Sequence, residues 1–275
     1  MNSERRAASS TLPPIQAARF TIYLIMLQII KNRRILILCT ATLLFVFSAT
    51  VSFSQHFSQL ATPAPLPPGS TLVIGFLGGY DLWDDPHRSV RRLILKLREQ
   101  PGVYAESISN HRRALALQLI RRALDTNRNG RLDPEEKTDA RIILFGQSWG
   151  GAAAIATARD LQKLGIPVLL TIQIDSVGFH DDIIPSNVRA AVNFYQHDPF
   201  TTIHGRARIR AADPSRTSIL GNFESTYVFR SVDESNASKA RRVFGGSHTK
   251  MELDPVVWNR VEQYIFDAIA RRPQP

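Results

Sequence analysis

The chain has 275 residues, of which 44% are hydrophobic and 21% are charged, and its formal net charge is +10. This composition is typical of a globular protein and excludes a long disordered or fibrous chain. The single cysteine, Cys39, excludes an intrachain disulfide. The basic excess is not organised into a nucleic-acid-binding module, so we expect no nucleic-acid partner.

The first 54 residues form a basic region followed by an apolar run. Ile35–Phe47 carries no charge and directly follows the basic residues 31–34, which is the pattern of a secretory signal peptide. An uncleaved membrane anchor fits the same run, because the uncharged stretch extends to Gln55. Positive charges precede the run, so the following domain is expected outside the cytoplasm, either exported or held at a membrane. Translation from Met26 would give a more typical signal peptide than translation from Met1.

Residues 55–70 are rich in proline and are expected to form a linker, so the folded domain is expected to span residues 71–275. Within it, short apolar runs alternate with stretches that have helical periodicity. Strands are predicted at Thr71–Leu77, Val103–Ile108, Arg141–Phe145, Val168–Ile174, Val188–Tyr195 and Tyr227–Val232, and helices at Pro86–Gln100, Asn110–Leu124, Gly151–Leu164 and Pro255–Ala270. This alternation predicts an α/β fold in which helices cover both faces of a mostly parallel sheet. Ligands of such folds bind at the carboxyl ends of the strands.

Residues 125–136 match a twelve-residue EF-hand calcium loop. Glycine stands at position 6, and the oxygen ligands fall at their usual positions, with a backbone carbonyl at position 7. The predicted ligands are Asp125, Asn127, Asn129, Arg131 through its carbonyl, Asp133 and Glu136. Three carboxylates beside two arginines predict modest affinity, so we expect structural Ca²⁺ and no organic cofactor; a metal-free turn of the same shape is the alternative.

The next predicted strand runs into Gly146-Gln147-Ser148-Trp149-Gly150, which a predicted alanine-rich helix follows. This is the strand–turn–helix context of a nucleophile elbow. A strained serine at the turn leaves no room for a Cβ two residues before or after it, which explains both glycines. A structural tight turn is the alternative interpretation of the motif.

This sequence resembles the α/β-hydrolase superfamily, in its lipase- and thioesterase-like branches, from about Thr71 to the end. The resemblance implies the α/β-hydrolase fold, acyl-ester chemistry and a triad in the order serine, acid, histidine. Ser148 would be the nucleophile. His248, in a glycine-rich loop before the last predicted helix, would be the base. The other six histidines fit the superfamily pattern less well.

The acid is expected at the carboxyl end of a strand. Asp175 follows Val168–Ile174 and is favoured, while Asp198, Asp181 and Asp182 remain alternatives. The oxyanion hole needs two backbone N–H groups. Trp149 is expected to supply one, and Leu77 or Gly78 the other.

Two functions follow from these residues. The first is an exported serine hydrolase that cleaves a small-molecule or lipid ester or thioester, with Gly178–Pro185 and Asp198–Ser218 as lid or substrate loops. The second is a non-catalytic binding or structural protein of the cell envelope that has this fold and is stabilised by calcium.

Overall fold

A computed structural model describes residues 55–199 and 203–271, which belong to one compact unit, Gln55–Pro275. The predicted signal or anchor segment, the Met26 start and Cys39 lie outside the described residues. Within the described ranges, no helix is both long and apolar enough to cross a membrane.

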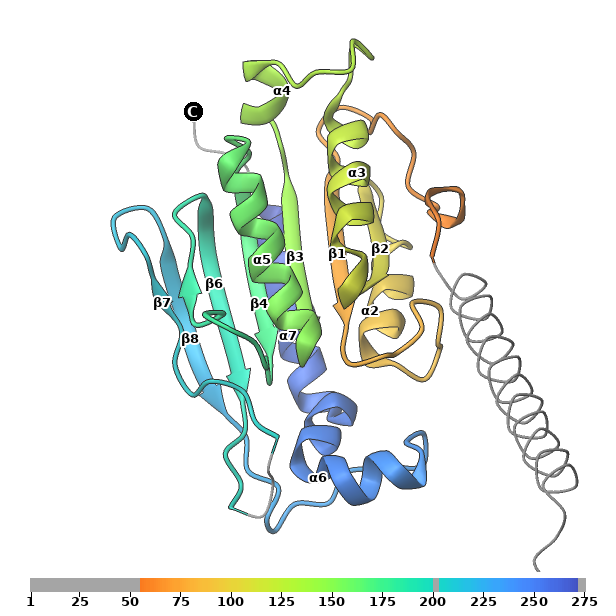
Figure 1. The fold of residues 1–275 in the computed structure, drawn as a ribbon, viewed down its shortest axis with the longest axis vertical. Coiled ribbons are helices and arrows are strands. Elements are labelled where there is room, and N and C mark those ends of the chain that lie inside the picture. Colours follow the sequence, from red (N-terminus) through yellow and green to blue (C-terminus); the bar gives the residue numbers. More distant parts are fainter. Residues whose placement is uncertain (1–54, 200–202, 272–275) are drawn as a thin grey trace, which may run out of the picture. The chain divides into compact units, whose positions relative to one another are not determined.

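Six parallel strands form the central sheet, in the order β2-β1-β3-β4-β6-β8 (Figure 1). Their bounds are Thr71–Leu77 for β1, Val103–Ser109 for β2, Ile142–Gln147 for β3, Val168–Ile174 for β4, Val188–Tyr195 for β6 and Ser218–Glu224 for β8. The inner strands are buried along almost their whole length, as expected for a sheet covered on both faces. All six carboxyl ends meet at one edge, which is the lower edge in Figure 1.

Helices cover both faces of this sheet. Helices α3 (Arg113–Leu124) and α5 (Trp149–Lys163) pack on the face that receives Leu72, Ile74 and Phe76 of β1. Helices α2 (Ser89–Leu97) and α7 (Pro255–Ala270) pack on the face that receives Val73 and Leu77. Alternate residues of β1 therefore serve opposite halves of the core. The predicted α/β fold class is confirmed, and the architecture is that of α/β-hydrolases.

The remaining elements are short or lie beyond the sheet. They are the 3-10 turns η1 (Phe57–Gln59) and η2 (Asn110–Arg112), helices α4 (Pro134–Thr138) and α6 (Lys239–Leu253), and the two-residue strands β5 (Ile183–Ile184) and β7 (Arg210–Ala211), which pair with each other.

The proline-rich residues 55–70 pack against the domain although they are mostly irregular. The backbone N–H groups of Ala61 and Thr62 donate to Oε1 of Glu106 on β2 at 2.7 and 2.8 Å, and Thr62 Oγ1 donates to the same oxygen at 2.9 Å. Glu106 is fully buried and also receives a bond from Arg98 at 2.6 Å. Leu66 is buried in the core. The Glu106 carboxylate thus binds two consecutive residues of this segment to β2, and Gln55 Nε2 adds a bond to the Ser107 carbonyl at 2.9 Å.

Two sequence-based predictions in the last third of the chain are wrong. The strand expected at Tyr227–Val232 is irregular, and the sixth strand is β8, at residues 218–224. Tyr227 accounts for the difference. Its side chain is buried and its hydroxyl donates to Asp254 at 2.8 Å, and these contacts hold the segment in an irregular conformation. The glycine-rich loop expected around His248 lies within α6 instead.

Candidate active site

Ser148 occupies a sharp turn between β3 and α5. Its backbone has φ 57° and ψ −128°, a region that side-chain-bearing residues rarely adopt. The turn is held by its neighbours, because Ser148 N–H donates to the Ile174 carbonyl at 3.0 Å and the Ser148 carbonyl accepts from Val177 N–H at 3.2 Å. Ser148 thus sits at the carboxyl edge of the sheet, where α5 begins.

The two glycines of the motif are required by contacts across the turn. A Cβ on Gly146 would lie 2.3 Å from Gly150 backbone atoms, and a Cβ on Gly150 would lie 2.0 Å from the Phe76 carbonyl oxygen. Neither position tolerates a side chain. This geometry is that of a nucleophile elbow, and it differs from an ordinary tight turn in pressing the new helix directly against β1.

Asp175 follows β4 and is fully buried, with φ 44°. Its Oδ1 accepts the Gly205 N–H at 2.6 Å, and its Oδ2 accepts Gln196 Nε2 at 2.9 Å. The same Oδ2 lies 2.6 Å from Nδ1 of His248. A carboxylate that accepts several hydrogen bonds is well suited to orient an imidazole.

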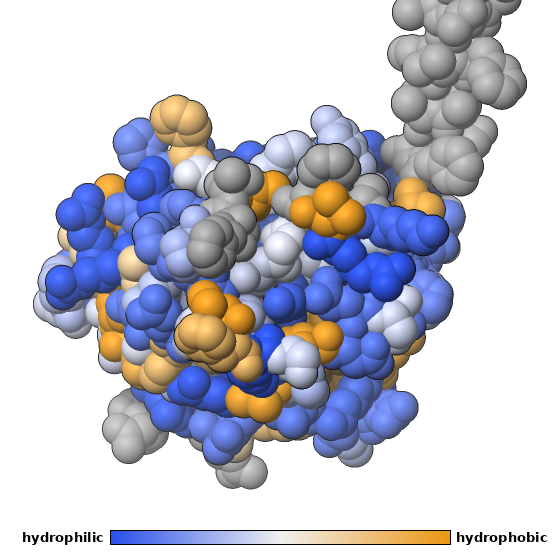
Figure 2. All heavy atoms as spheres, turned by 90° about the horizontal axis from the view of Figure 1, so that it is seen from below, coloured by the Kyte–Doolittle hydropathy of each residue, from blue (hydrophilic) through white to orange (hydrophobic). Residues whose placement is uncertain are grey.

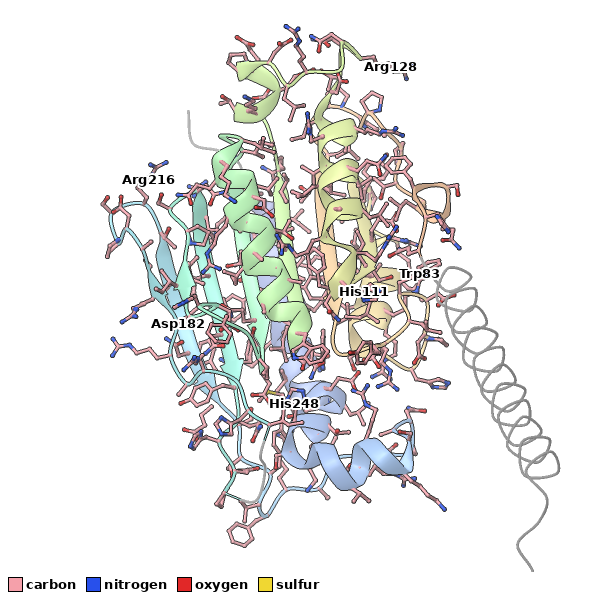
Figure 3. All side chains as sticks on the ribbon, viewed as in Figure 1. Trp83, His111, Arg128, Asp182, Arg216 and His248 are labelled. Atoms are coloured by element: carbon pink, nitrogen blue, oxygen red, sulfur yellow. The ribbon has the colours of Figure 1, made fainter. Side chains whose placement is uncertain are left out.

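His248 reaches Asp175 from α6, at the carboxyl edge of the sheet (Figure 3). The helix is kinked at Gly246, whose φ of 47° and ψ of −128° interrupt two helical segments. His248 therefore lies in the first turn of the second segment, where the sequence had suggested a flexible loop. Glycine is required beside the kink too, because a Cβ on Gly245 would lie 2.0 Å from Thr249 Oγ1. A helix fixes the histidine more firmly than a loop would.

The other acid candidates are engaged elsewhere. Asp198 accepts from Thr226 Oγ1 at 2.9 Å and from Tyr227 N–H at 2.8 Å. Burial by itself raises the pKa of Asp198, but hydrogen bonds, including one from Ser247, outweigh burial and leave that pKa below its ordinary value.

Asp181 and Asp182 also have partners away from His248. Asp181 accepts from Ser176 Oγ at 2.5 Å, and burial raises its pKa. Asp182 pairs with Arg210 at 3.5 Å and lies apart from His248 in Figure 3. Of the four aspartates considered, Asp175 is the one whose carboxylate contacts His248.

The segment after β1 lies directly against the serine. A Cβ on Gly78 would be 2.9 Å from the Ser148 Cβ, so the backbone approaches Ser148 closely. Asn110 Nδ2 holds this segment by donating to the Leu77 carbonyl at 3.0 Å and to the Gly79 carbonyl at 2.5 Å. Trp149 is the first residue of α5, and its N–H belongs to the helix turn that lacks intrahelical acceptors. The predicted oxyanion residues are thus gathered around Ser148.

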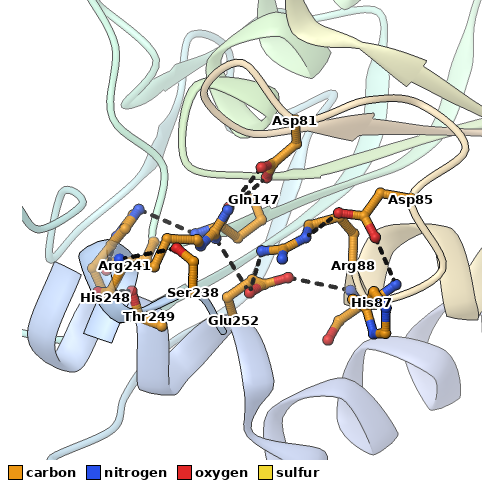
Figure 4. Close-up of polar contacts among 12 residues, drawn as sticks. Asp81, Asp85, His87, Arg88, Gln147, Ser238, Arg241, His248, Thr249 and Glu252 are labelled. Carbon is orange, nitrogen blue, oxygen red and sulfur yellow. Dashed lines mark hydrogen bonds and ion pairs between the residues drawn. The ribbon is translucent and has the colours of Figure 1, made fainter. Parts of the chain in front are cut away.

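A buried ionic network links the segment after β1 to α6 (Figure 4). Arg241 donates to both carboxylate oxygens of Asp81, at 2.7 and 3.0 Å, and to Glu252 Oε2 at 3.3 Å. Arg88 also approaches Glu252, at 3.4 Å. Burial raises the pKa of Glu252 although both arginines oppose the shift. Sequence reasoning missed this network, because its members are far apart in the chain.

Two further glutamines of the site were also missed. Gln196 binds Asp175, and Gln147 Nε2 lies 3.1 Å from Nε2 of His248. A signal was present for both: Gln147 is inside the elbow motif, and Gln196 follows β6, the strand that pairs with β4.

The EF-hand-like loop lies at the opposite end of the sheet from His248, as the label of Arg128 in Figure 3 shows. Its side chains bond within the loop: Asp125 accepts the N–H groups of Asn129 and Gly130, each at 3.0 Å, and Asp133 Oδ2 accepts the side-chain amides of Asn127 at 2.7 Å and Asn129 at 3.1 Å.

A calcium ion would need both asparagine amides to turn their oxygens inward. Glu136 Oε1 accepts from Thr126 N–H at 2.8 Å, and Asp133 caps α4. Across residues 55–199 and 203–271, no three His, Cys, Asp or Glu side chains are gathered to hold a metal. The calcium site stays a prediction.

Comparisons with known proteins identify distant folds only. No family model matches the chain, and no curated protein matches it. Similar solved structures include a dienelactone hydrolase from Anabaena variabilis, at 12% identity over 74% of this chain and 87% of that one. A dienelactone hydrolase-like promiscuous phosphotriesterase from metagenomic libraries has 15% identity over 76% and 87%. A cutinase-like protein from Cryptococcus sp. has 15% identity over 76% and 98%. Each TM-score is 0.36, so the fold assignment rests on the strand order and the elbow.

Proposed function

We propose that this protein is a serine hydrolase that cleaves an ester or thioester through an acyl-enzyme. The observation that carries the proposal is the 2.6 Å contact between Asp175 Oδ2 and His248 Nδ1, at the sheet edge where the elbow presents Ser148. Nucleophile turn, base and buried carboxylate come from β3, α6 and β4, and all face one edge. The combination is the one that activates a serine hydroxyl.

In this mechanism, Ser148 Oγ attacks the carbonyl carbon of the substrate while its proton passes to His248 Nε2. Asp175 stays ionised and stabilises the imidazolium through Nδ1–H. The negative oxygen of the tetrahedral intermediate accepts hydrogen bonds from the Trp149 N–H and from the N–H of Gly78 or Leu77. The imidazolium then protonates the leaving alcohol or thiol, and a water molecule, deprotonated by His248, releases the acid.

An apolar surface beside Ser148 supports an ester with an apolar part. The Tyr80 and Trp149 rings meet edge to face with centroids 5.7 Å apart, and their side chains are 87% and 44% exposed. Figure 2 shows that hydrophobic residues on this face form separate patches among hydrophilic ones. This arrangement favours a small-molecule or lipid ester that binds at a few apolar contacts.

Two further parts of the proposal concern the environment of the enzyme. Export, with cleavage or membrane anchoring of the first 54 residues, follows from the basic and apolar pattern alone. Structural calcium follows from the loop at residues 125–136. Mass spectrometry of the native amino terminus tests the first, and a peptide from residues 2–19 would contradict translation from Met26.

A fluorophosphonate probe tests the enzyme directly, because it phosphonylates an activated serine. We expect labelling of the full chain and its loss in Ser148→Ala. Ser231→Ala is the matched control, since Ser231 is exposed in the loop after β8 and contacts none of the three residues. Absence of labelling in folded wild-type protein would reject the enzyme and favour the non-catalytic envelope protein. Hydrolysis of esters of graded chain length then defines the acyl group.

A further inference from the structure

The residue before the nucleophile contacts the base in this structure. Gln147 ends β3 and is 2% exposed, and its Nε2 lies 3.1 Å from Nε2 of His248 (Figure 4). Its carboxamide oxygen faces the other way, toward Gly78, where an added Cβ would be 2.5 Å from it. The Gln147 amide therefore lies between the oxyanion segment and the base.

The surroundings of Asp175 decide which nitrogen of His248 carries the proton. Asp175 accepts from Gly205 N–H and from Gln196 Nε2, so the group is set up as a carboxylate acceptor. A carboxylate 2.6 Å from Nδ1 requires a proton on Nδ1. In the neutral imidazole, Nε2 then holds a lone pair and must accept.

An amide nitrogen only donates, so the contact at Nε2 is a hydrogen bond from Gln147 into that lone pair. The same lone pair has to receive the Ser148 proton before the serine can attack. The Ser148 hydroxyl and the Gln147 amide therefore compete as donors for the one lone pair of His248 Nε2, and in this structure the Gln147 amide is bonded to it.

We propose that Gln147 is a positioning residue that occupies the lone pair of His248 between turnovers and must release it before Ser148 is activated. This inference rests on the proposed function of the same site. The carboxamide keeps the neutral imidazole in the required tautomer, and at the same time it lowers the reactivity of the free enzyme. Substrate that enters between Gly78 and His248 displaces the amide and frees the base.

Two substitutions that nearly conserve side-chain size separate this role from a purely structural one. Gln147→Met removes the donor, and we expect the rate of fluorophosphonate labelling to rise about two- to tenfold, the range that one net hydrogen bond supplies. Gln147→Glu places an acceptor at Nε2 and favours the imidazolium, so labelling at neutral pH should fall below that of the wild type. Gln173→Met is the control, because Gln173 is equally buried but donates to the Asp181 carbonyl.

A second readout does not depend on activity. Accepting a hydrogen bond shields an imidazole nitrogen, so the ¹⁵N resonance of His248 Nε2 should move downfield in Gln147→Met and stay in place in Gln173→Met. Labelling of Gln147→Met that is equal to or slower than that of the wild type overturns the inference. Absence of labelling in every variant rejects the proposed function instead, and an unchanged Nε2 resonance then rejects the contact as well.

Discussion

Asp175→Asn is the sharpest test of the candidate triad, because it changes one atom and almost no volume. The carboxylate accepts on both oxygens: Gly205 N–H lies 2.6 Å from Oδ1, and His248 Nδ1 and Gln196 Nε2 lie 2.6 and 2.9 Å from Oδ2. An asparagine has one acceptor oxygen and one donor NH₂ group. Whichever way the amide turns, a donor must face a donor.

If the NH₂ group replaces Oδ2, it faces the donor Gln196 Nε2, and it can donate to His248 Nδ1 only by forcing the imidazole proton onto Nε2, where the lone pair is needed. If it replaces Oδ1, it meets the Gly205 N–H, whose loop would have to move. Loss of a charged acceptor in a fully buried site lowers the free energy of unfolding by about 2–4 kcal/mol. About 1.5–3 kcal/mol of this is the hydrogen bond to the charged group, and the rest is part of the desolvation penalty of the donor left without an acceptor. The wrong tautomer lowers the rate of the chemical step about 10⁴-fold.

The assay compares the fluorophosphonate labelling rate with urea denaturation of the same samples. Asp198→Asn is the matched control, because Asp198 is also buried and also accepts from two segments, but does not contact His248. We expect Asp198→Asn to lose stability and to keep its labelling rate. If Asp175→Asn, still folded, labels at more than a tenth of the wild-type rate, or if Asp198→Asn loses its labelling, Asp175 is not the acid.

Two predictions concern other regions. If the loop at residues 125–136 binds calcium, Ca²⁺ at ten times its dissociation constant adds about 1.4 kcal/mol of stability, which raises Tm by about 3–6 °C, and Asp125→Ala abolishes the rise; no change in Tm at millimolar Ca²⁺ removes the site. The second prediction concerns pH. Because the folded-state pKa of Asp198 lies below the ordinary 3.8, its stabilising contribution is present above pH 3.8 and is lost as the pH falls through the folded-state value. The difference in unfolding free energy between wild type and Asp198→Asn should therefore shrink in acid, and a difference that is constant from pH 7 to pH 3 contradicts this.

The sequence predicted the centre of the domain well because burial and periodicity agree there. Strands β1, β4 and β6 and helix α7 have the predicted bounds. Each of these strands is an apolar run with clear ends, and α7 begins with a proline at its first position, capped by Asp254. The elbow was also predictable, since its glycines are fixed by contacts within the motif and with the first strand.

The last third of the chain was harder because tertiary contacts override its local pattern. Strand β8 is only partly buried along its length and contains Gly221 and Asn222, two residues that disfavour strands. Helix α6 consists of two helical segments that meet at a kink at Gly246, where the sequence pattern Gly245-Gly246 predicts the end of a helix. The partners of Asp175 were hidden for another reason. Gln196 and Gly205 come from loops whose positions only the sheet order brings together.

The position of His248 within α6 has a consequence for when the protein becomes reactive. The histidine follows Asp175 by 73 residues and comes after all six strands of the sheet. A nascent chain can complete its sheet and build the serine turn while α6 is still being synthesised, and at that stage the serine has no base. The hydrolase that we propose is therefore inactive until α6 has been synthesised and has folded, because that helix supplies its base. A chain that terminates between β8 and His248 lacks the base of the proposed triad and is expected not to hydrolyse esters.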